Sequence, residues 1–275
     1  MKTPYRWPAE ALWQAIEPRL PGFSIEVLPE IDSTNAELMR RLRSGRADPV
    51  LLVAEHQSAG RGRMARVWHS SGAGAGSVGN AGPGSLTFSL GLSMAPKDWS
   101  GLSLAVGLSL AQSLHPDIRL KWPNDVWWQG RKLAGILIET ANSGSPSSAG
   151  SRYVVIGVGL NIQCPTALGL STAPAGLVEL LPGTSAGQAL QRLMAPLVET
   201  LLTFEQHGFA PFQAAFNARD ALAQQAVTLS DGMQGIAQGV DLGGALQVQT
   251  AQGLQRVTSA EVSVRPAAAF AGRLE

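Results

Sequence analysis

Apolar residues recur at helical spacing in two long segments of this 275-residue chain. Residues 100–114 are apolar on nearly all sides, and residues 186–206 carry an apolar side chain every three or four positions. This spacing predicts two helices that pack in a core. Helical spacing or capping residues predict further, shorter helices at 8–20, 32–43 and 209–218.

Apolar and β-branched runs predict strands between these helices. They lie at 24–31, 50–55, 86–92, 118–120 and 153–162, and the runs 126–128 and 133–140 flank a turn and predict a β-hairpin. After about Leu222 five short alternating runs follow, at 226–229, 235–240, 245–250, 254–257 and 262–264. Glycine-containing turns separate several of them, which indicates a small β-barrel. We therefore predict two domains, residues 1–222 and 223–275.

Composition narrows the function classes. Charged residues make up 15% of the chain and the formal net charge is +1, which disfavours a protein that binds long polyanions. Cys164 is the one cysteine, so no intrachain disulfide forms, which fits a cytoplasmic protein; we expect Cys164 to be a small core residue. No apolar run reaches the length of a membrane helix. The Gly/Ser-rich stretch 71–85 is expected to be mobile.

Residues 60–68 read Gly-Arg-Gly-Arg-Met-Ala-Arg-Val-Trp and directly follow a predicted strand. Glycine lets the backbone approach a ligand closely, and arginine suits carboxylate and phosphate. Three further polar segments, 121–125, 131–135 and 157–161, add lysines, asparagines, an aspartate and glycines. Together they supply cations for phosphate, oxygen ligands for Mg²⁺ and space for a flat ligand. No P-loop and no dinucleotide fingerprint is present.

Ser33-Thr34-Asn35, Gln57, and residues 60–68, 121–125, 131–139 and 156–161 stand in the order and approximate spacing of the biotin–protein ligases. The chain resembles that family from about Glu26 to Arg265. The resemblance implies an α+β fold, with a mixed-sheet catalytic domain of the class II synthetase-like biotin/lipoate ligase type. A small C-terminal SH3-like β-barrel is implied after it.

The resemblance also implies a two-step reaction. Biotin and ATP give biotinyl-5′-AMP and pyrophosphate, and a lysine of a biotin carboxyl carrier protein, a subunit of acetyl-CoA carboxylase, then takes the biotinyl group. Mg²⁺ is the implied cofactor. The implied form is monofunctional, without an N-terminal DNA-binding domain, and is a monomer or homodimer that contacts neither DNA nor membrane.

Site residues follow from the same resemblance. Lys132, Arg63 and Arg61 are implied as catalytic residues, and Asn124 and Asp125 as Mg²⁺ contacts. The implied biotin-binding residues are Ser33, Thr34, Asn35, Gln57, Gly60, Arg61, Lys132, Gly135, Gly157 and Gly159. The implied ATP-binding residues are Arg63, Arg66, Trp68, Lys121, Asn124, Asn161 and Arg265. In the barrel, Glu261 and Arg265 match positions associated with the nucleotide and the carrier.

One departure and two alternatives accompany this interpretation. The chain has Ala65 where the family usually has glycine, and because alanine restricts φ we expect loop closure to differ. A lipoate or octanoate ligase would use the same chemistry on another acyl group. A nucleic-acid-binding module would use the arginines and the barrel instead, although the weak net charge and the few aromatic residues of the barrel disfavour it.

Overall fold

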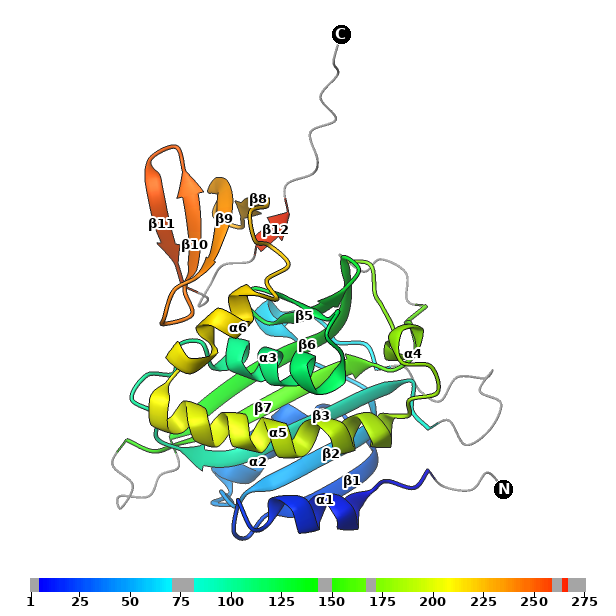
Figure 1. Ribbon diagram of the computed structural model, residues 1–275. Coiled ribbons are helices and arrows are strands. Elements are labelled where there is room, and N and C mark those ends of the chain that lie inside the picture. The colour runs from blue at the N-terminus through cyan, green and yellow to red at the C-terminus, as the bar shows by residue number, and fades with distance from the viewer. Residues whose placement is uncertain (1–4, 71–81, 143–149, 167–171, 259–263, 267–275) are drawn as a thin grey trace.

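The computed structural model describes residues 5–70, 82–142, 150–166, 172–258 and 264–266. Of residues 264–266 only the backbone is described. Most of the predicted mobile stretch 71–85 and Glu261 lie outside the described residues. Figure 1 shows a larger sheet domain with a smaller all-β domain at one end of it. None of the helices in the described ranges has the length and hydropathy that a bilayer span requires.

The larger domain is built on a sheet of seven strands. They are β1 (Ser24–Ile31), β2 (Val50–Gln57), β3 (Ser85–Met94), β4 (Arg119–Lys121), β5 (Asp125–Trp128), β6 (Arg131–Asn142) and β7 (Arg152–Asn161). Their order is β1-β2-β3-β7-β6-β5-β4. β1 and β2 are parallel and the other neighbours are antiparallel, so the predicted mixed sheet is confirmed.

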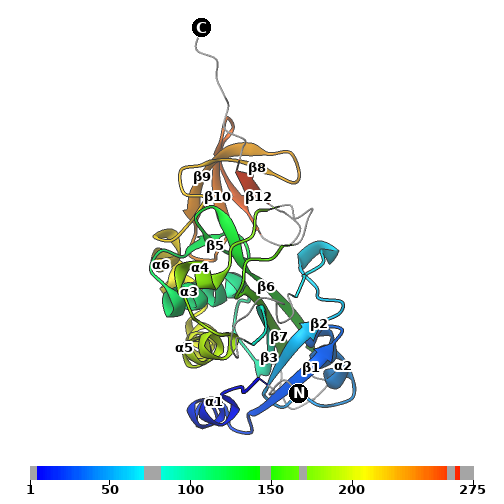
Figure 2. The same ribbon diagram turned by 90° about the vertical axis from the view of Figure 1, so that its right-hand side faces the viewer.

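Helices cover both faces of this sheet (Figure 2). α1 (Ala9–Ile16), α3 (Leu102–Leu114) and α5 (Ala186–His207) lie on one face, and α2 (Thr34–Arg43) lies on the other. Because side chains alternate along a strand, each strand contributes to both faces. Leu51 of β2, for example, belongs to the core on the side of α1, α3 and α5, whereas its neighbour Leu52 packs with Leu38 of α2.

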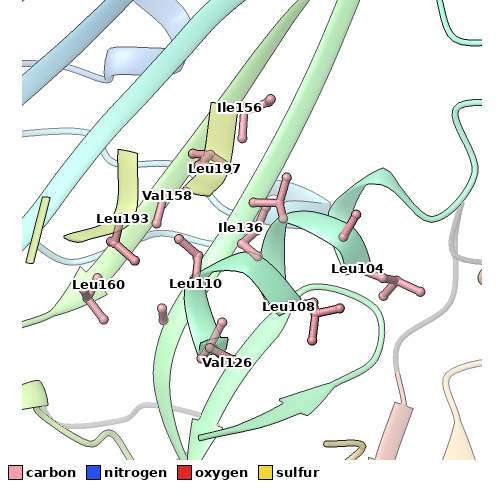
Figure 3. Packing of buried hydrophobic residues seen from close by; sticks show 14 of the residues in the cluster. Leu104, Leu108, Leu110, Val126, Ile136, Ile156, Val158, Leu160, Leu193 and Leu197 are labelled. Atoms are coloured by element: carbon pink, nitrogen blue, oxygen red, sulfur yellow. The ribbon is translucent and has the colours of Figure 1, made fainter. Parts of the chain in front are cut away.

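The main core lies between α3, α5 and the sheet (Figure 3). Leu104, Leu108 and Leu110 of α3 are almost completely buried, as are Ile136 of β6 and Leu193 of α5. Such burial is the dominant stabilising term in folding, so this side of the sheet serves as a rigid support. On the opposite face, next to the N-terminus of α2, lie the polar residues described below.

The smaller domain is an antiparallel sheet of five strands in the order β11-β10-β9-β8-β12. They are β8 (Ala226–Leu229), β9 (Gln234–Val240), β10 (Leu246–Thr250), β11 (Gly253–Val257) and β12 (Val264–Pro266). Each predicted run therefore forms a strand within two residues of its expected bounds. The predicted all-β character of this segment is confirmed.

Three details differ from the sequence-based expectations. Cys164 is exposed, so its prediction as a core residue is wrong: it lies in the loop that follows β7. Between β7 and the long helix α5, where no helix was predicted, the chain forms the short helix α4 (Leu177–Leu180). The helix expected at 209–218 is a 3₁₀ turn, Ala210–Phe212, followed by α6 (Gln213–Asn217).

The connection between the two sheets pairs with β4. Leu120 donates its N–H to the carbonyl of Arg219 at 2.8 Å and accepts from Ala221 at 2.8 Å. Between them, Asp220 accepts a hydrogen bond from the N–H of Leu222 through Oδ1, while its Oδ2 is buried with no partner among the described residues. This burial raises the pKa of Asp220 to about 6.

We expect the stability of the protein to fall as pH rises toward neutrality because of Asp220. Its folded pKa lies above its ordinary value, so the folded state holds the proton more tightly between about pH 4 and pH 6. Asp220→Asn is expected to flatten this dependence and to raise the free energy of unfolding at pH 7.5 by roughly 1–2 kcal/mol. Urea unfolding at pH 5 and 7.5 measures this, with the exposed Asp117→Asn as the control. Equal pH responses of the wild type and Asp220→Asn would contradict the assignment.

Candidate active site

A cleft of about 730 Å³ lies over the α2 face of the sheet. It brings together every predicted site residue except Gly60, Arg265 and Glu261, the last of which lies outside the described residues. The predicted residues that line it are Ser33, Thr34, Asn35, Gln57, Arg61, Arg63, Arg66, Trp68, Lys121, Asn124, Asp125, Lys132, Gly135, Gly157, Gly159 and Asn161. Arg265 lies on β12, and its side chain is outside the described part of the chain.

One wall of the cleft is the N-terminus of α2. Ser33 caps the helix, with its Oγ accepting from the N–H of Ala36 at 3.4 Å. Thr34 and Asn35 follow at the first helical positions and are buried. Gln57, at the end of β2, accepts from the N–H of Thr34 through Oε1 at 2.8 Å. The ordinary cap predicted from sequence is therefore present, and polar groups beside it face the cleft.

The glycines of β7 make room for side chains from other elements. A Cβ on Gly157 would lie 2.1 Å from Oδ1 of Asn35, and a Cβ on Gly159 would lie 2.3 Å from the ring of Trp68. No real Cβ tolerates such distances, so both positions require glycine. These two strand glycines let Asn35 and Trp68 lie directly against the sheet.

The arginine loop, residues 60–68, is a closed turn. Trp68 donates its N–H to the carbonyl of Gly60 at 2.9 Å, and Gly62 donates to the carbonyl of Arg66 at 2.7 Å. A Cβ on Gly60 would lie 2.4 Å from the carbonyl oxygen of Trp68, so glycine is required for closure. Gly60 therefore shapes the loop from outside the cleft, whereas Arg61 pairs with Glu139 at 2.9 Å.

Two non-glycine residues of this loop adopt left-handed backbone conformations. Met64 has a φ of 55° and Ala65 a φ of 56°. A left-handed conformation costs an alanine about 1–2 kcal/mol. The expectation that Ala65 affects the loop thus has a physical basis, because glycine would hold the same turn without this cost.

Ala65→Gly is expected to relieve this strain and to stabilise the closed loop by about 0.5–1 kcal/mol, after the larger entropy of glycine in the unfolded chain is subtracted. Amide exchange at residues 62–68 in the unliganded protein measures the effect. We expect slower exchange in Ala65→Gly than in the wild type. Faster exchange would mean that flexibility, rather than strain, dominates at this position.

Trp68 covers the glycine-lined part of the cleft. A Cβ on Gly135 would lie 3.6 Å from the Trp68 ring, and a Cβ on Gly159 would lie 2.3 Å from it. Its indole Nε1 is buried with no partner among the described residues. A buried N–H without an acceptor is costly, so the indole is available to donate a hydrogen bond to a bound ligand.

Lys132 is directed into the cleft by an irregularity between β5 and β6. The register shifts between Val126 and Trp127, as in a β-bulge, which changes the direction of side chains on the bulged strand. Nζ of Lys132 forms an ion pair with Oδ1 of Asp125 at 2.7 Å. The Lys132 backbone is held on its other side, where it donates to the carbonyl of Ala173 at 2.8 Å.

The cleft is electropositive. Burial lowers the pKa of Arg63. The nearby charge of Asp125 raises this pKa, and the charge of Arg66 lowers it. A half-buried guanidinium in that setting is stabilised by an anion that enters the cleft. Lys121 lies nearby, 5.2 Å from the centre of the Trp127 ring. Phosphate or carboxylate is the kind of group that these cations suit.

Oxygen donors suited to Mg²⁺ are present, although no cluster of three acidic, histidine or cysteine side chains occurs among the described residues. The carboxylate of Asp125 lines the cleft. Asn124 donates its amide N–H to the carbonyl of Ile136 at 2.9 Å, which leaves its amide oxygen to act as an acceptor. One carboxylate and one amide oxygen fit a Mg²⁺ ion held largely by substrate phosphates.

Sequence reasoning missed two residues of this site, Ser89 and Glu139. Ser89 is completely buried, and its Oγ lies 2.7 Å from Thr34 and 2.6 Å from Asn35. The sequence does contain a signal, because Ser85, Thr87 and Ser89 alternate with apolar residues in an otherwise buried strand. Buried polar residues on one strand face indicate a polar network, and this face is directed toward the cleft side of the sheet.

Comparisons with known proteins agree with this arrangement. The Biotin/lipoate A/B protein ligase family matches residues 27–161, and the Biotin protein ligase C terminal domain matches residues 225–265. The bifunctional ligase/repressor BirA of Escherichia coli is 34% identical over 90% of this chain and 76% of its own length. The biotin–[acetyl-CoA-carboxylase] ligase of Paracoccus denitrificans is 32% identical over 86% of this chain and 98% of its own length.

Solved structures show the same fold. A biotin protein ligase from Aquifex aeolicus in complex with biotin and ATP has a TM-score of 0.72 and 24% identity, covering 88% of this chain and 98% of that protein. The likeness extends over both domains, so the predicted SH3-like C-terminal barrel is confirmed together with the catalytic fold. By these matches the chain belongs to the biotin/lipoate A/B protein ligase family, in the group that carries the biotin protein ligase C-terminal domain.

Proposed function

We propose that this protein activates biotin with ATP, forming biotinyl-5′-AMP, and transfers the biotinyl group to a lysine of a biotin carboxyl carrier protein. One observation carries this proposal. A single cleft contains both a neutral polar pocket at Thr34, Asn35 and Gln57 and a group of cations around Lys132 and Arg63. A cleft of this kind suits a ligand with an uncharged polar head and an anionic reacting end.

In the first step, an oxygen of the biotin carboxylate attacks the α-phosphorus of ATP. The bond from this phosphorus to the bridging oxygen of the β-phosphate breaks, and pyrophosphate leaves with that bond's electrons. Two anions have to approach each other, so fixed positive charge lowers the barrier. Lys132 and Arg63 line the cleft and would supply such charge. Asp125 holds Lys132 in place in the unliganded protein.

In the second step, the carrier lysine attacks the activated acyl carbon as a free amine, and AMP leaves. The amine has to lose a proton as the amide bond forms. Asp125 is the carboxylate that lines the cleft among the described residues, and we propose it as the acceptor of that proton. The arginine loop, which ends at Trp68, covers the cleft and would exclude water from the reactive anhydride.

Asp125 and the amide oxygen of Asn124 are the groups that would hold Mg²⁺ together with the phosphates of ATP. The bound ion would neutralise phosphate charge during the first step. Asn161 donates its amide to the carbonyl of Ala175 at 3.1 Å and lines the cleft, which leaves its amide oxygen for a ligand. We propose it as a nucleotide contact.

The test is transfer to a carrier domain, followed by mass spectrometry of the intact carrier. We expect biotin, ATP and Mg²⁺ to add one biotinyl group and to release AMP and pyrophosphate. A carrier whose acceptor lysine is replaced by arginine is the control and should stay unmodified. Release of ADP and phosphate, or modification of the control, would contradict the proposed chemistry.

A further inference from the structure

The turn that joins β9 to β10, residues 241–245 and called here the docking turn, connects the smaller domain to the larger one. It packs on the start of α3, where a Cβ on Gly244 would lie 2.8 Å from Cα of Gly101. Gly244 has a φ of 81°, so this position needs glycine both for its backbone conformation and for the close approach. The carbonyl of Gly244 accepts a hydrogen bond from Nε1 of Trp122 at 3.1 Å.

The docking turn is held in one shape by Asp241. Oδ1 of Asp241 accepts from the N–H groups of Gly243 and Ala245, each at 2.9 Å. The carbonyl of Asp241 accepts from the N–H of Gly244 at 3.0 Å, and its carboxylate also forms an ion pair with Arg256 of β11. A turn with these bonds is rigid relative to its own sheet, so the carbonyl of Gly244 is presented at a fixed place.

Trp122, on the other side of this contact, belongs to the loop between β4 and β5. Lys121 and Asp125 pair with each other at the ends of that loop. Both of them line the cleft, as do Pro123 and Asn124. Trp122 is not among the lining residues and is completely buried. Its side chain therefore reaches the smaller domain, while its neighbours in the chain face the cleft.

Three elements hold the loop 122–124 in place. From α3, Oγ of Ser103 donates to the carbonyl of Pro123 at 3.0 Å. From β6, the N–H of Ile136 donates to the carbonyl of Asn124 at 3.0 Å, and Nδ2 of Asn124 donates back to Ile136 at 2.9 Å. The bond of Trp122 to the docking turn is the third of these contacts, and it comes from the smaller domain.

We propose that the docking turn and Trp122 position the loop 122–124 for ATP and its Mg²⁺, so that the smaller domain takes part in the activation step before a carrier binds. Trp122 is a positioning residue, because it acts through the cleft-lining residues beside it. The inference rests on the proposed function, in which Asn124 and Asp125 hold Mg²⁺ with the phosphates of ATP. It adds the source of their placement, which lies in another domain.

Trp122→Phe keeps an aromatic ring and removes the N–H donor, which leaves the buried carbonyl of Gly244 without this partner. In pyrophosphate release without carrier, we expect the KM for ATP to rise by at least about fivefold, the effect of one lost buried hydrogen bond. The KM for biotin should stay within about twofold, since none of the three contacts involves the polar pocket at residues 34–35 and 57. Loss of folded protein lowers the apparent rate but leaves both KM values unchanged.

Trp13→Phe is the matched control for this substitution. The indole of Trp13 on α1 also donates to a backbone carbonyl, that of Phe23, and at the same distance of 3.1 Å. Trp13 is not among the residues that line the cleft. We expect Trp13→Phe to leave the KM values for ATP and for biotin as they are in the wild type.

Gly244→Ala tests the same contact from the smaller domain. The atom that its methyl would meet belongs to the backbone of Gly101, so the docking turn has to move away from α3 and from Trp122. We again expect a higher KM for ATP and an unchanged KM for biotin. Gly232→Ala in the turn between β8 and β9 is the control, because its φ is 89° and a Cβ there would meet nothing within 4 Å. An equal rise in the two variants would overturn the role of the docking contact.

Amide exchange over residues 121–128 in the unliganded protein gives a readout that does not depend on activity. We expect faster exchange there in Trp122→Phe and Gly244→Ala, and wild-type exchange in both controls. An unchanged KM for ATP in Trp122→Phe and Gly244→Ala would overturn the inference, whether or not transfer to the carrier is slowed. A wild type that releases no pyrophosphate with biotin would overturn the proposed function instead, and the exchange rates would still test whether the docking turn holds the loop.

Discussion

Replacing Lys132 with alanine is expected to slow biotin-dependent pyrophosphate release by about 100- to 1,000-fold, the loss that follows removal of one preorganised electrostatic donor. The ammonium of Lys132 lines the cleft and is held 2.7 Å from Asp125, so it enters the reaction already in place. Its removal also leaves Asp125 without this partner, which adds negative charge where two anions have to meet. Single-turnover release at saturating biotin and ATP isolates the chemical step from binding.

Lys97→Ala is the control for this substitution, because Lys97 is exposed and is not among the residues that line the cleft. It should leave the rate unchanged. Unfolding curves of both variants separate a catalytic loss from a loss of folded protein. A Lys132→Ala rate within a few-fold of the wild type would remove Lys132 from the proposed catalytic group.

Gly157→Ala is expected to have the second-largest effect, on both stability and biotin binding. The added methyl would lie 2.1 Å from Oδ1 of Asn35, and that side chain is 4% exposed and bonded on both sides, so it has little room to move. We expect a loss of about 1–3 kcal/mol in the free energy of unfolding, as in other overpacked cores. Displacement of Asn35 should also weaken biotin binding by at least about tenfold, because the buried contacts of the pocket would be broken.

Gly107→Ala in α3 is the matched control. The nearest heavy atoms to a Cβ there are 3.4 Å away, an ordinary contact, and alanine favours a helix more than glycine does. Urea unfolding and biotin calorimetry on both variants give the comparison. Equal unfolding midpoints and biotin affinities for Gly157→Ala and the wild type would show that Asn35 is not held as described.

The fold was largely predictable because hydrophobic residues recur at regular helical or strand spacing in most of its elements. The strand over Ser24–Ile31 was predicted at its observed bounds, and the barrel strands lie within two residues of theirs, since glycine-containing turns separate them. The order of the strands was not derivable from periodicity. It depends on long-range pairing, such as β3 with β7, that no local pattern encodes.

That the candidate site residues line one cleft was predictable, because the motifs stand in the sequence at a spacing typical of the family. Contacts between motifs were not. The ion pair of Lys132 with Asp125 depends on a bulge in a hairpin, and the placement of Asn35 depends on a glycine in a strand more than 120 positions away. Ser89 was missed because a serine in an apolar strand has no motif of its own. Cys164 was misplaced because a single cysteine in a loop has no neighbouring periodic pattern from which its burial could be predicted.

The proposed activation of biotin is tested most directly by pyrophosphate release from ATP and Mg²⁺, with biotin, lipoate or octanoate as the only added acid. We expect release with biotin alone, because the polar pocket at Thr34, Asn35 and Gln57 suits a cyclic urea. Release with lipoate or octanoate instead would keep the fold and the cationic group but contradict the assignment of that pocket. Absence of release with any of the three acids would contradict the proposed activation step itself.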